Sequence, residues 1–321
     1  METNEQRQRK LFELLTGYNR LLLACHQKPD GDTLGAGTAL AHWLKGLGKE
    51  VTLFCLDKPG QTYAFLDHSG EFTNDPSIFA STYDAIVVLD SGTLAYAGVH
   101  KLIDSLSGDT TVINIDHHKS NAQFGHFNLV DETASSTSEI IADFFKVNNQ
   151  KLDASMATSL MTGIMNDTAY FTNAATNIHS LELTSEFLTA GARSSEVAKA
   201  MFKNKDAKTL NLWGSALARL KHNSRLNLAF TYLKQEDLVK AGAKPGATEG
   251  LINFLNAICG GAETIMVLTQ ADDNLIKGSF RSVRTDVARL AKLFGGGGHK
   301  LAAGFTIAGR IVETEKGIKI I

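Results

Sequence analysis

The first half of the chain alternates short apolar runs with stretches of helical periodicity. Helical patterns at about 33–47 and 95–106 lie between the apolar runs. Four apolar runs predict strands buried on both faces, as parallel strands are: residues 20–25, 50–55, 84–90 and 111–116. Strands that alternate with helices predict an α/β domain built on a doubly wound, mainly parallel sheet.

The pattern changes in the second half of the chain. Residues 135–221 are helical in periodicity, and Ser136 and Glu139 have capping-box spacing at the start of one helix. Strand-like runs then return at 226–233, 263–270 and 275–282. Together with a length of 321 residues, this change predicts two domains joined by a linker. We expect a first domain at 1–203, a linker at 204–224 and a smaller α/β domain at 225–321.

Composition narrows the classes of function. Hydrophobic residues make up 43% and charged residues 21%, and the net charge of −2 argues against a surface that follows long nucleic acid. No apolar run approaches the roughly 20 residues that span a bilayer, and the N-terminal segment lacks a signal-peptide core. Three isolated cysteines argue against a disulfide framework and a thiolate zinc site. We therefore expect a cytoplasmic protein without a membrane partner.

Side chains that can bind metals cluster at predicted element ends. The carboxyl ends of parallel strands meet at one edge of a sheet, so residues following different strands can share one site. Such residues follow three strands and end one helix: His26, Asp30 and Asp32 after the first strand, Asp90 after the third, Asp116, His117 and His118 after the fourth, and Asp167 at the helix end. One aspartate or histidine at a strand end is commonly a cap or a core residue. Four segments that supply ligands to one edge favour a metal site.

The charges of these residues indicate which ions could bind. Four close carboxylates, Asp30, Asp32, Asp90 and Asp167, would repel one another unless cations lie between them. Two divalent ions balance their charge of −4, and neutral His26 and His117 complete the shells. Carboxylate and imidazole ligands without thiolate suit manganese, with magnesium as the alternative. Two such ions about 4 Å apart form a clamp for phosphoryl chemistry.

The segment 277–300 is basic and rich in glycine. It holds six Lys or Arg against one Asp, and four consecutive glycines let backbone N–H groups approach an anion or a nucleotide. The segment lacks the features of a Walker loop and of a dinucleotide-binding fingerprint. We expect Arg289 and Lys292 to be solvated on a helix face. Phe280 and Phe294 could stack on a base, but core packing is the expected use of both.

The motifs and their order resemble a known family. "PDGD" after the first strand, "LDS" after the third and "DHH" after the fourth resemble the motifs of the DHH phosphoesterase superfamily. The run "GGGGHKLAAGF" at 295–305 resembles the motif of the DHH-associated C-terminal domain. Length and layout are most similar to the nano-RNase and pAp-phosphatase group. Its members degrade very short oligoribonucleotides and dephosphorylate 3′-phosphoadenosine 5′-phosphate (pAp).

The resemblance implies a role for each motif residue. One metal would be bound by His26 and Asp30, the other by Asp32, His117 and Asp167, with Asp90 bridging both. In the catalytic set, His118 would contact the substrate phosphate and act as an acid near the leaving group, and Asp116 would orient the histidines. The far end of the nucleotide would contact Arg281, Gly296, Gly297, Gly298 and His299. Many relatives have Gly-Ser where this chain has Gly35-Ala36, which puts a packing or phosphate contact in doubt.

These expectations amount to a manganese-dependent hydrolase of short oligoribonucleotides and pAp, using a hydroxide activated by two metals in a cleft between the domains. The resemblance leaves open a cyclic or linear dinucleotide phosphodiesterase, and an inactive nucleotide sensor is the alternative from another class. A pyrophosphatase or exopolyphosphatase would share the metal motifs but leave the glycine-rich motif unexplained. The oligomeric state is open, with a homodimer as one option.

Overall fold

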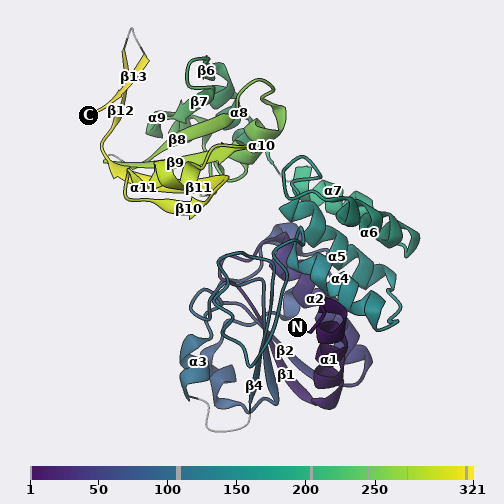
Figure 1. Cartoon of the computed structure of the whole chain (residues 1–321). Coiled ribbons are helices and arrows are strands. Elements are labelled where there is room, and N and C mark those ends of the chain that lie inside the picture. The colour runs from purple at the N-terminus through teal and green to yellow at the C-terminus, as the bar shows by residue number, and fades with distance from the viewer. Residues whose placement is uncertain (1, 106–109, 203–204, 245, 273, 315–316) are drawn as a thin grey trace. The chain divides into compact units, whose positions relative to one another are not determined.

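The structure is a computed structural model that describes residues 2–105, 110–202, 205–244, 246–272, 274–314 and 317–321. The chain folds as two units, Met1–Asn204 and Lys205–Ile321 (Figure 1). Within the described residues, no helix is long and apolar enough to cross a membrane.

The first unit contains a parallel sheet of five strands in the order β2-β1-β3-β4-β5. The strands are β1 (Arg20–Cys25), β2 (Glu50–Phe54), β3 (Ala85–Leu89), β4 (Thr111–Asp116) and β5 (Phe127–Val130). Four of them confirm the predicted apolar runs, whereas β5 was not predicted. The direction of the strand order reverses between β1 and β3, which is where ligands bind in open α/β sheets.

Helices cover both faces of this sheet, as a doubly wound fold requires (Figure 1). On β1, Leu21 and Leu23 pack into a core with α1, α2, α4 and α5, whereas Leu22 and Ala24 pack on the opposite face with Leu102 of α3. The helices are α1 (Asn4–Gly17), α2 (Gly31–Gly46), α3 (His100–Ser105), α4 (Thr137–Val147), α5 (Ala154–Asp167), α6 (Ile178–Thr189) and α7 (Ser194–Phe202). Three 3-10 turns lie between β2 and β3: η1 (Gln61–Tyr63), η2 (Ser69–Glu71) and η3 (Pro76–Ala80).

Two local predictions differ from the structure. The helix expected at 95–106 begins only at His100, because Gly98 has a φ of +75° and a Cβ there would overlap Leu56. Ser136 accepts a hydrogen bond from the Glu139 amide at 3.0 Å, as a helix cap does. The Glu139 carboxylate accepts a hydrogen bond from the Ser135 amide at 3.1 Å, not from the Ser136 amide that a capping box requires. Only half of the capping box therefore forms.

The helices α2 and α5 cross at very short range because glycine lies on both. A Cβ on Gly35 of α2 would overlap the carbonyl oxygen of Ser159 in α5, and one on Gly163 of α5 would overlap Ser138 of α4. Ala36, at the position where the family resemblance led us to expect serine, is fully buried in the apolar core. The side chain at this position therefore packs in the core, and close packing explains the small residues.

The second unit contains a mixed sheet of six strands in the order β10-β11-β9-β8-β7-β6. Only β7 and β8 are parallel, and the other neighbours are antiparallel. The strands are β6 (Lys221–Asn223), β7 (Leu228–Leu233), β8 (Thr264–Asp272), β9 (Leu275–Ser282), β10 (Gly297–His299) and β11 (Ala302–Ala308), followed by the hairpin β12 (Ile311–Thr314) and β13 (Gly317–Ile320). The helices are α8 (Ala207–Ala218), α9 (Gln235–Ala241), α10 (Leu251–Ile258) and α11 (Val287–Lys292).

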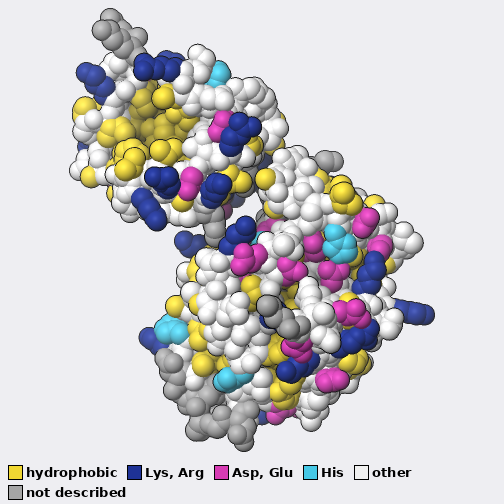
Figure 2. Space-filling view, in the orientation of Figure 1, with side chains coloured by type: hydrophobic (Ala, Val, Ile, Leu, Met, Phe, Trp, Pro, Cys, Tyr) yellow, Lys and Arg dark blue, Asp and Glu magenta, His cyan; other side chains and the backbone are white. Residues whose placement is uncertain are grey.

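The segment expected to be a linker, 204–224, largely belongs to this second unit. Leu212, Trp213 and Ala216 of α8 are buried against Leu251 and Leu255 of α10. The apolar stripe of α8 thus makes it part of the core. Figure 2 shows further hydrophobic side chains gathered on the second unit, over the region that Figure 1 labels β8 and β9.

Candidate metal centre and active site

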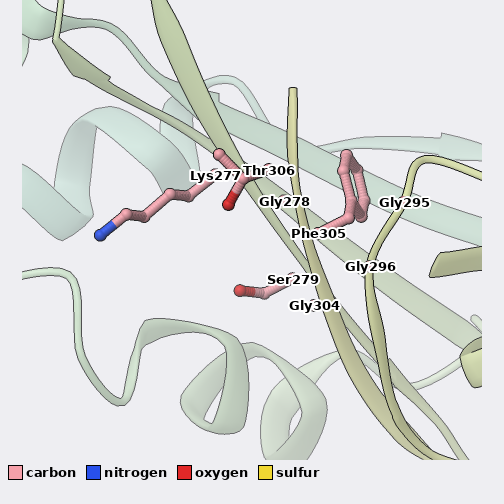
Figure 3. A pocket seen from close by; sticks show the side chains of 8 residues that line it. All are labelled: Lys277, Gly278, Ser279, Gly295, Gly296, Gly304, Phe305 and Thr306. Carbon is pink, nitrogen blue, oxygen red and sulfur yellow. The ribbon is translucent and has the colours of Figure 1, made fainter. Parts of the chain in front are cut away.

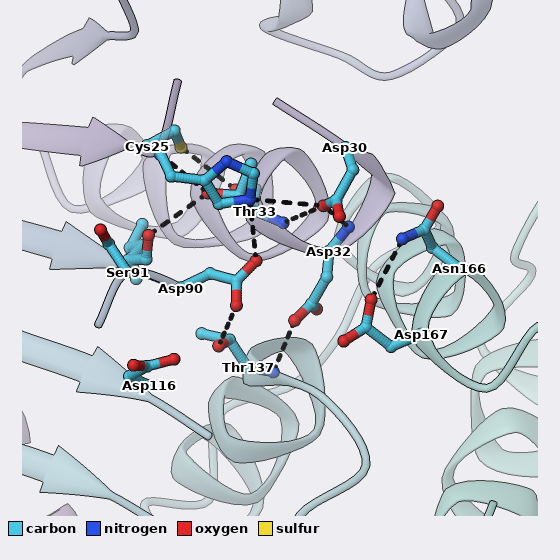
Figure 4. Close-up of polar contacts among 12 residues, drawn as sticks. Cys25, Asp30, Asp32, Thr33, Asp90, Ser91, Asp116, Thr137, Asn166 and Asp167 are labelled. Atoms are coloured by element: carbon cyan, nitrogen blue, oxygen red, sulfur yellow. Dashed lines mark hydrogen bonds and ion pairs between the residues drawn. The ribbon is translucent and has the colours of Figure 1, made fainter. Parts of the chain in front are cut away.

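Three neighbouring strands of the first unit end at the same level. Cys25 of β1 pairs with Leu89 of β3, and Leu89 pairs with Ile115 of β4. His26 and Asp90 therefore follow their strands side by side, with the "DHH" segment beside them. Figure 4 shows the carboxylates of the predicted ligands turned toward one another in this region. The strand ends thus bring together the side chains that the sequence predicted to cluster.

The first group of ligand atoms surrounds His26. Its Nε2 atom is 3.3 Å from Asp90 Oδ2 and 3.7 Å from Asp30 Oδ1. Its Nδ1 atom is 2.7 Å from the carbonyl oxygen of Gln27, which can only accept, so we assign the ring proton to Nδ1. Burial lowers the pKa of His26, but the two carboxylates outweigh burial and raise it to about 12. This part of the site therefore favours a positive charge next to Nε2.

The second group consists of Asp32, His117 and Asp167. The carboxylate of Asp32 is fully buried and accepts hydrogen bonds from the amides of Thr137 at 2.7 Å and Ser138 at 2.9 Å. These amides begin α4, and a helix N-terminus stabilises an anion. His117 Nε2 is buried and makes no hydrogen bond, although Asp167 Oδ2 lies 3.2 Å away.

Asp90 lies between the two groups. Its Oδ2 atom faces His26, whereas its Oδ1 atom is 3.6 Å from His117 Nε2 and accepts a hydrogen bond from Thr137 Oγ1 at 3.1 Å. Asp90 has a φ of +55°, a left-handed conformation that is uncommon for residues other than glycine. Such a conformation persists where the surroundings fix it, and it points the carboxylate at both histidines.

The "DHH" aspartate holds the second histidine in place. Asp116 Oδ1 is 2.7 Å from His118 Nδ1 and also accepts from the amide of His117 at 2.8 Å. Its other oxygen accepts from Asn121 Nδ2 at 2.5 Å. Burial lowers the pKa of His118, but the Asp116 carboxylate outweighs it and raises this pKa above its ordinary value. The His118 side chain is 32% exposed, so a substrate could reach it.

These residues fit divalent cations. Three overlapping groups each place their ligand atoms within 4.8 Å of one another: His26, Asp30 and Asp90; Asp32, His117 and Asp167; and Asp90, Asp116, His117 and His118. Burial, with repulsion from Asp90 and Asp167, raises the pKa of Asp32 well above its ordinary value. The His117 nitrogen, which makes no hydrogen bond among the described residues, and the crowded carboxylates are the features that a bound cation would satisfy.

Two residues at the centre were not predicted from the sequence. Thr137 lies at the start of α4, and the capping signal at Ser136 could have marked it as a place for an anion. Asn121 lies in the loop after β4 and has no comparable signal in the sequence. Both residues donate hydrogen bonds to carboxylates of the centre. Thr137 donates to Asp32 and Asp90, and Asn121 donates to Asp116.

In the second unit, Arg281 lies on β9. Its guanidinium donates from Nε to Asn253 Oδ1 at 2.9 Å and from Nη1 to the Phe280 carbonyl at 3.0 Å, and burial lowers its pKa. Phe280 is buried in the core as expected, whereas Phe294 is 46% exposed and stacks on Phe305 with ring centroids 4.7 Å apart.

The glycine run forms a strand rather than an open loop. Gly297 and Gly298 belong to β10 and pair with β11, and a Cβ on Gly296 would overlap the Gly304 carbonyl. The backbone of His299 ends β10, but its side chain lies outside the described part of the chain. The run therefore uses glycine for close strand packing.

A hollow of about 390 Å³ lies beside this run (Figure 3). In Figure 3, the side chains of Lys277, Ser279 and Thr306 extend from one side of the sheet, and Phe305 extends from the other toward Gly295. The remaining lining residues are Gly278, Gly296 and Gly304. Gly296 is thus a predicted substrate residue that lines the hollow, and Lys277 and Ser279 are lining residues that the prediction omitted.

Comparison with known proteins identifies the family. Residues 20–164 match the N-terminal domain of the DHH family, and residues 226–318 match the DHHA1 domain. The chain is a DHH-family protein. It is 29% identical over 293 residues to a Thermus thermophilus protein named bifunctional oligoribonuclease and PAP phosphatase NrnA, covering 90% of this chain and 84% of that protein.

Two further matches extend over most of this DHH-family chain. The Bacillus subtilis protein of the same name is 26% identical, covering 93% of this chain and 92% of that protein. The crystal structure of an exopolyphosphatase-related protein from Bacteroides fragilis superposes with a TM-score of 0.85 at 24% identity, covering 93% and 90% of the two chains. The structural match confirms the α/β fold. The family and its named relatives make this chain a hydrolase of phosphoester bonds.

Proposed function

We propose that this DHH-family hydrolase is a manganese-dependent enzyme that cleaves short oligoribonucleotides and removes a phosphate from pAp. The substrate class is supported by two relatives that carry both activities in their names and align with at least 90% of this chain. The observation that carries the reaction type is the position of Asp90. Its two oxygens face separate groups of ligand atoms, as a carboxylate shared by two cations would.

The residues of the centre would divide the chemistry among them. Two divalent cations, when bound, neutralise phosphate oxygens and make hydroxide available near neutral pH. The residues that would hold them are His26, Asp30, Asp32, Asp90, His117 and Asp167. Asp116 binds the Nδ1 side of His118, so Nε2 is the atom that we assign to the substrate phosphate and to the leaving oxygen.

The choice of manganese rests on the ligand types. The site offers carboxylates and imidazoles but no thiolate. Carboxylates suit both manganese and magnesium, whereas imidazoles suit magnesium less well. Cys25 is buried near the centre, but its thiol donates to the carbonyl oxygen of Thr33 at 3.1 Å. All three cysteines are free, which agrees with the proposed location in a reducing cytoplasm.

The second unit would bind the end of the substrate that does not react. Arg281 uses two of its five N–H groups within the protein, and Lys277 and Ser279 line the hollow beside the glycine run. We propose that Arg281, the backbone at Gly296–Gly298 and His299 contact the nucleotide. Cationic and N–H groups of this kind bind phosphate and position it for reaction.

The test compares substrates and one matched pair of variants. Purified protein with manganese receives pAp, a dinucleotide, a 5-mer, a 24-mer and cyclic di-AMP in parallel. We expect turnover of pAp and of dinucleotides to 5-mers, with slower cleavage of the 24-mer. Asp90→Ala should abolish turnover while the fold, measured by circular dichroism, is kept. Asp131→Ala is the control, because Asp131 also follows a strand of this sheet, but its carboxylate accepts hydrogen bonds from Asn4 and Thr133 and belongs to none of the three ligand groups among the described residues.

Each other outcome contradicts a part of the proposal. Turnover of Asp90→Ala near the wild-type rate with manganese would refute the shared-carboxylate role. Fastest cleavage of cyclic di-AMP would support the dinucleotide phosphodiesterase instead. Fastest cleavage of the 24-mer would refute the preference for short substrates, and binding without any turnover would support a nucleotide sensor.

A further inference from the structure

A second cluster of titratable side chains lies at the opposite ends of α2 and α5 from the metal centre. His42 is on α2, His68 precedes η2, and Asp153 caps the start of α5. His42 Nε2 is 2.7 Å from Asp153 Oδ2, His42 Nδ1 is 3.2 Å from His68 Nε2, and His68 Nδ1 is 2.6 Å from Glu71 Oε1. Lys45 pairs with the other oxygen of Glu71. The two histidines therefore face each other between two carboxylates.

The protons in this cluster can be counted. Hydrogen bonds from Lys45 and His68 outweigh burial and lower the pKa of Glu71, and the Met156 amide and His42 do the same for Asp153. Both carboxylates are therefore ionised at neutral pH and can only accept, so His42 donates from Nε2 and His68 from Nδ1.

A neutral imidazole carries a single N–H group. Without an added cation, the facing atoms, His42 Nδ1 and His68 Nε2, would therefore both present lone pairs at 3.2 Å. Two lone pairs at hydrogen-bond distance repel each other unless a cation lies between them. That cation is either a shared proton or a metal ion.

We propose that His42 and His68 form a binding site for a divalent transition-metal ion of the zinc class, separate from the catalytic centre. Two nitrogens that each bind Zn²⁺ at 2.0–2.1 Å with tetrahedral geometry lie about 3.3 Å apart, close to the spacing found here. Imidazole ligands favour Zn²⁺, Cu²⁺ or Ni²⁺ over Mg²⁺ and Mn²⁺.

The surroundings of the pair match those of histidines that bind metals. Such histidines donate their other N–H group to a carboxylate, as His42 does to Asp153 and His68 to Glu71. The side chains of His42 and His68 are 32% and 20% exposed, which leaves access for the ion and for water ligands. His68 has a φ of +68°, so its backbone is held in an uncommon conformation that directs the ring toward His42.

The site is distant from the catalytic residues. His42 follows Asp32 by ten positions on the same helix, which places them roughly 15 Å apart along the axis at 1.5 Å per residue. An ion bound to both histidines would tie the η2 segment to α2, while His42 also contacts the start of α5. None of the proposed catalytic ligands belongs to this cluster.

The test measures zinc binding by the full-length chain with the catalytic centre disabled. In the double variant His26→Ala/His117→Ala, equilibrium dialysis against Zn²⁺ and elemental analysis should give one Zn²⁺ per chain. Adding His42→Ala should weaken this binding at least tenfold, and adding Glu71→Gln should weaken it about 10–100-fold. His179→Ala is the matched control: His179 also contacts a carboxylate, Asp143 at 2.7 Å, but no second histidine faces it among the described residues.

A second measurement keeps the test decisive if the double variant does not fold. Wild-type protein should then bind one more Zn²⁺ per chain than His42→Ala, and both should hydrolyse substrate equally with manganese. Zinc binding that is unchanged by His42→Ala, or reduced equally by His179→Ala, would overturn the proposal. A folded double variant that binds no Zn²⁺ would show that the histidines share only a proton.

Discussion

Replacing Gly163 by alanine should damage the metal centre without touching a ligand directly. Gly163 lies on α5, and a Cβ there would be 2.6 Å from Asp32 Oδ1 and closer still to Ser138 Oγ. Asp32 is held at that place by the Ser138 amide, which donates to the same oxygen at 2.9 Å. The added methyl group must therefore displace a proposed metal ligand, the start of α4, or α5 itself.

The size of the effect follows from two opposing contributions. Alanine in a helix is more stable than glycine by about 0.5–1 kcal/mol. An extra methyl group in a tightly packed core costs about 1–3 kcal/mol. The net loss in the free energy of unfolding should therefore be at most about 2.5 kcal/mol, or a fall in Tm of up to roughly 10 °C for a unit of this size. Because Asp32 must move, manganese affinity should fall at least tenfold, which corresponds to about 1.4 kcal/mol.

Denaturant unfolding and manganese titration of the same samples measure both quantities. The matched control is Gly214→Ala in α8, where a Cβ would meet nothing within 4 Å. That variant should be as stable as the wild type or more stable by up to about 1 kcal/mol, with unchanged metal affinity. If Gly163→Ala behaves like Gly214→Ala in both assays, the close contact between α5 and Asp32 does not position the ligand.

Three further predictions concern single side chains. His117→Ala should lose metal from one site, whereas His118→Ala should keep its metals and lose turnover; equal metal loss in elemental analysis would refute this distinction. Asp237→Asn should destabilise the second unit by about 1–3 kcal/mol near neutral pH, because two hydrogen bonds from Arg219 at 2.6 and 3.0 Å outweigh burial and lower the pKa of the Asp237 carboxyl. This stabilisation is present above the unfolded pKa of about 3.9 and is lost as pH falls through the lower folded pKa. If the wild type stays more stable than Asp237→Asn at a pH below the folded pKa, the prediction is wrong. Arg281→Ala should lower kcat/KM for dinucleotides about ten- to a hundredfold, or roughly 1.5–3 kcal/mol, and should affect a small aryl phosphodiester much less; equal losses would exclude a contact with the far end.

The sequence predicted the parts of the fold that depend on long apolar runs. Strands β1 and β3 are apolar at nearly every position because both of their faces are buried, and β4 keeps enough apolar residues between its polar ones to be predicted as well. Strand β5 has only four residues, of which two are buried, so it gives no such signal. Strand β10 overlaps the glycine run, for which the sequence suggested only close approach to an anion or a nucleotide, whereas the structure shows that the close approach of β11 requires glycine there.

The ligand positions were predictable for a different reason. His26, Asp90 and His117 each follow a buried strand directly, so strand pairing alone brings them together. Their roles as ligands stay predictions that metal analysis can test. The capping signal could mark Thr137 as a place for an anion but not say which one, and Gly163 gave no signal. Both contacts with the centre join segments distant in sequence: the Thr137 amide donates to Asp32, 105 positions away.

The carboxylates of the centre differ in how well the protein itself stabilises their charge. Asp32 accepts two amides at a helix N-terminus, and Asp30 accepts the amides of Asp32 and Thr33 at the start of α2. Asp167 ends α5, where the helix dipole disfavours an anion, and it accepts a hydrogen bond from Asn166 Nδ2 at 3.1 Å. Burial, with repulsion from Asp30 and Asp90, raises the pKa of Asp167. A bound cation would therefore stabilise the charge of Asp167 in its proposed role as a ligand.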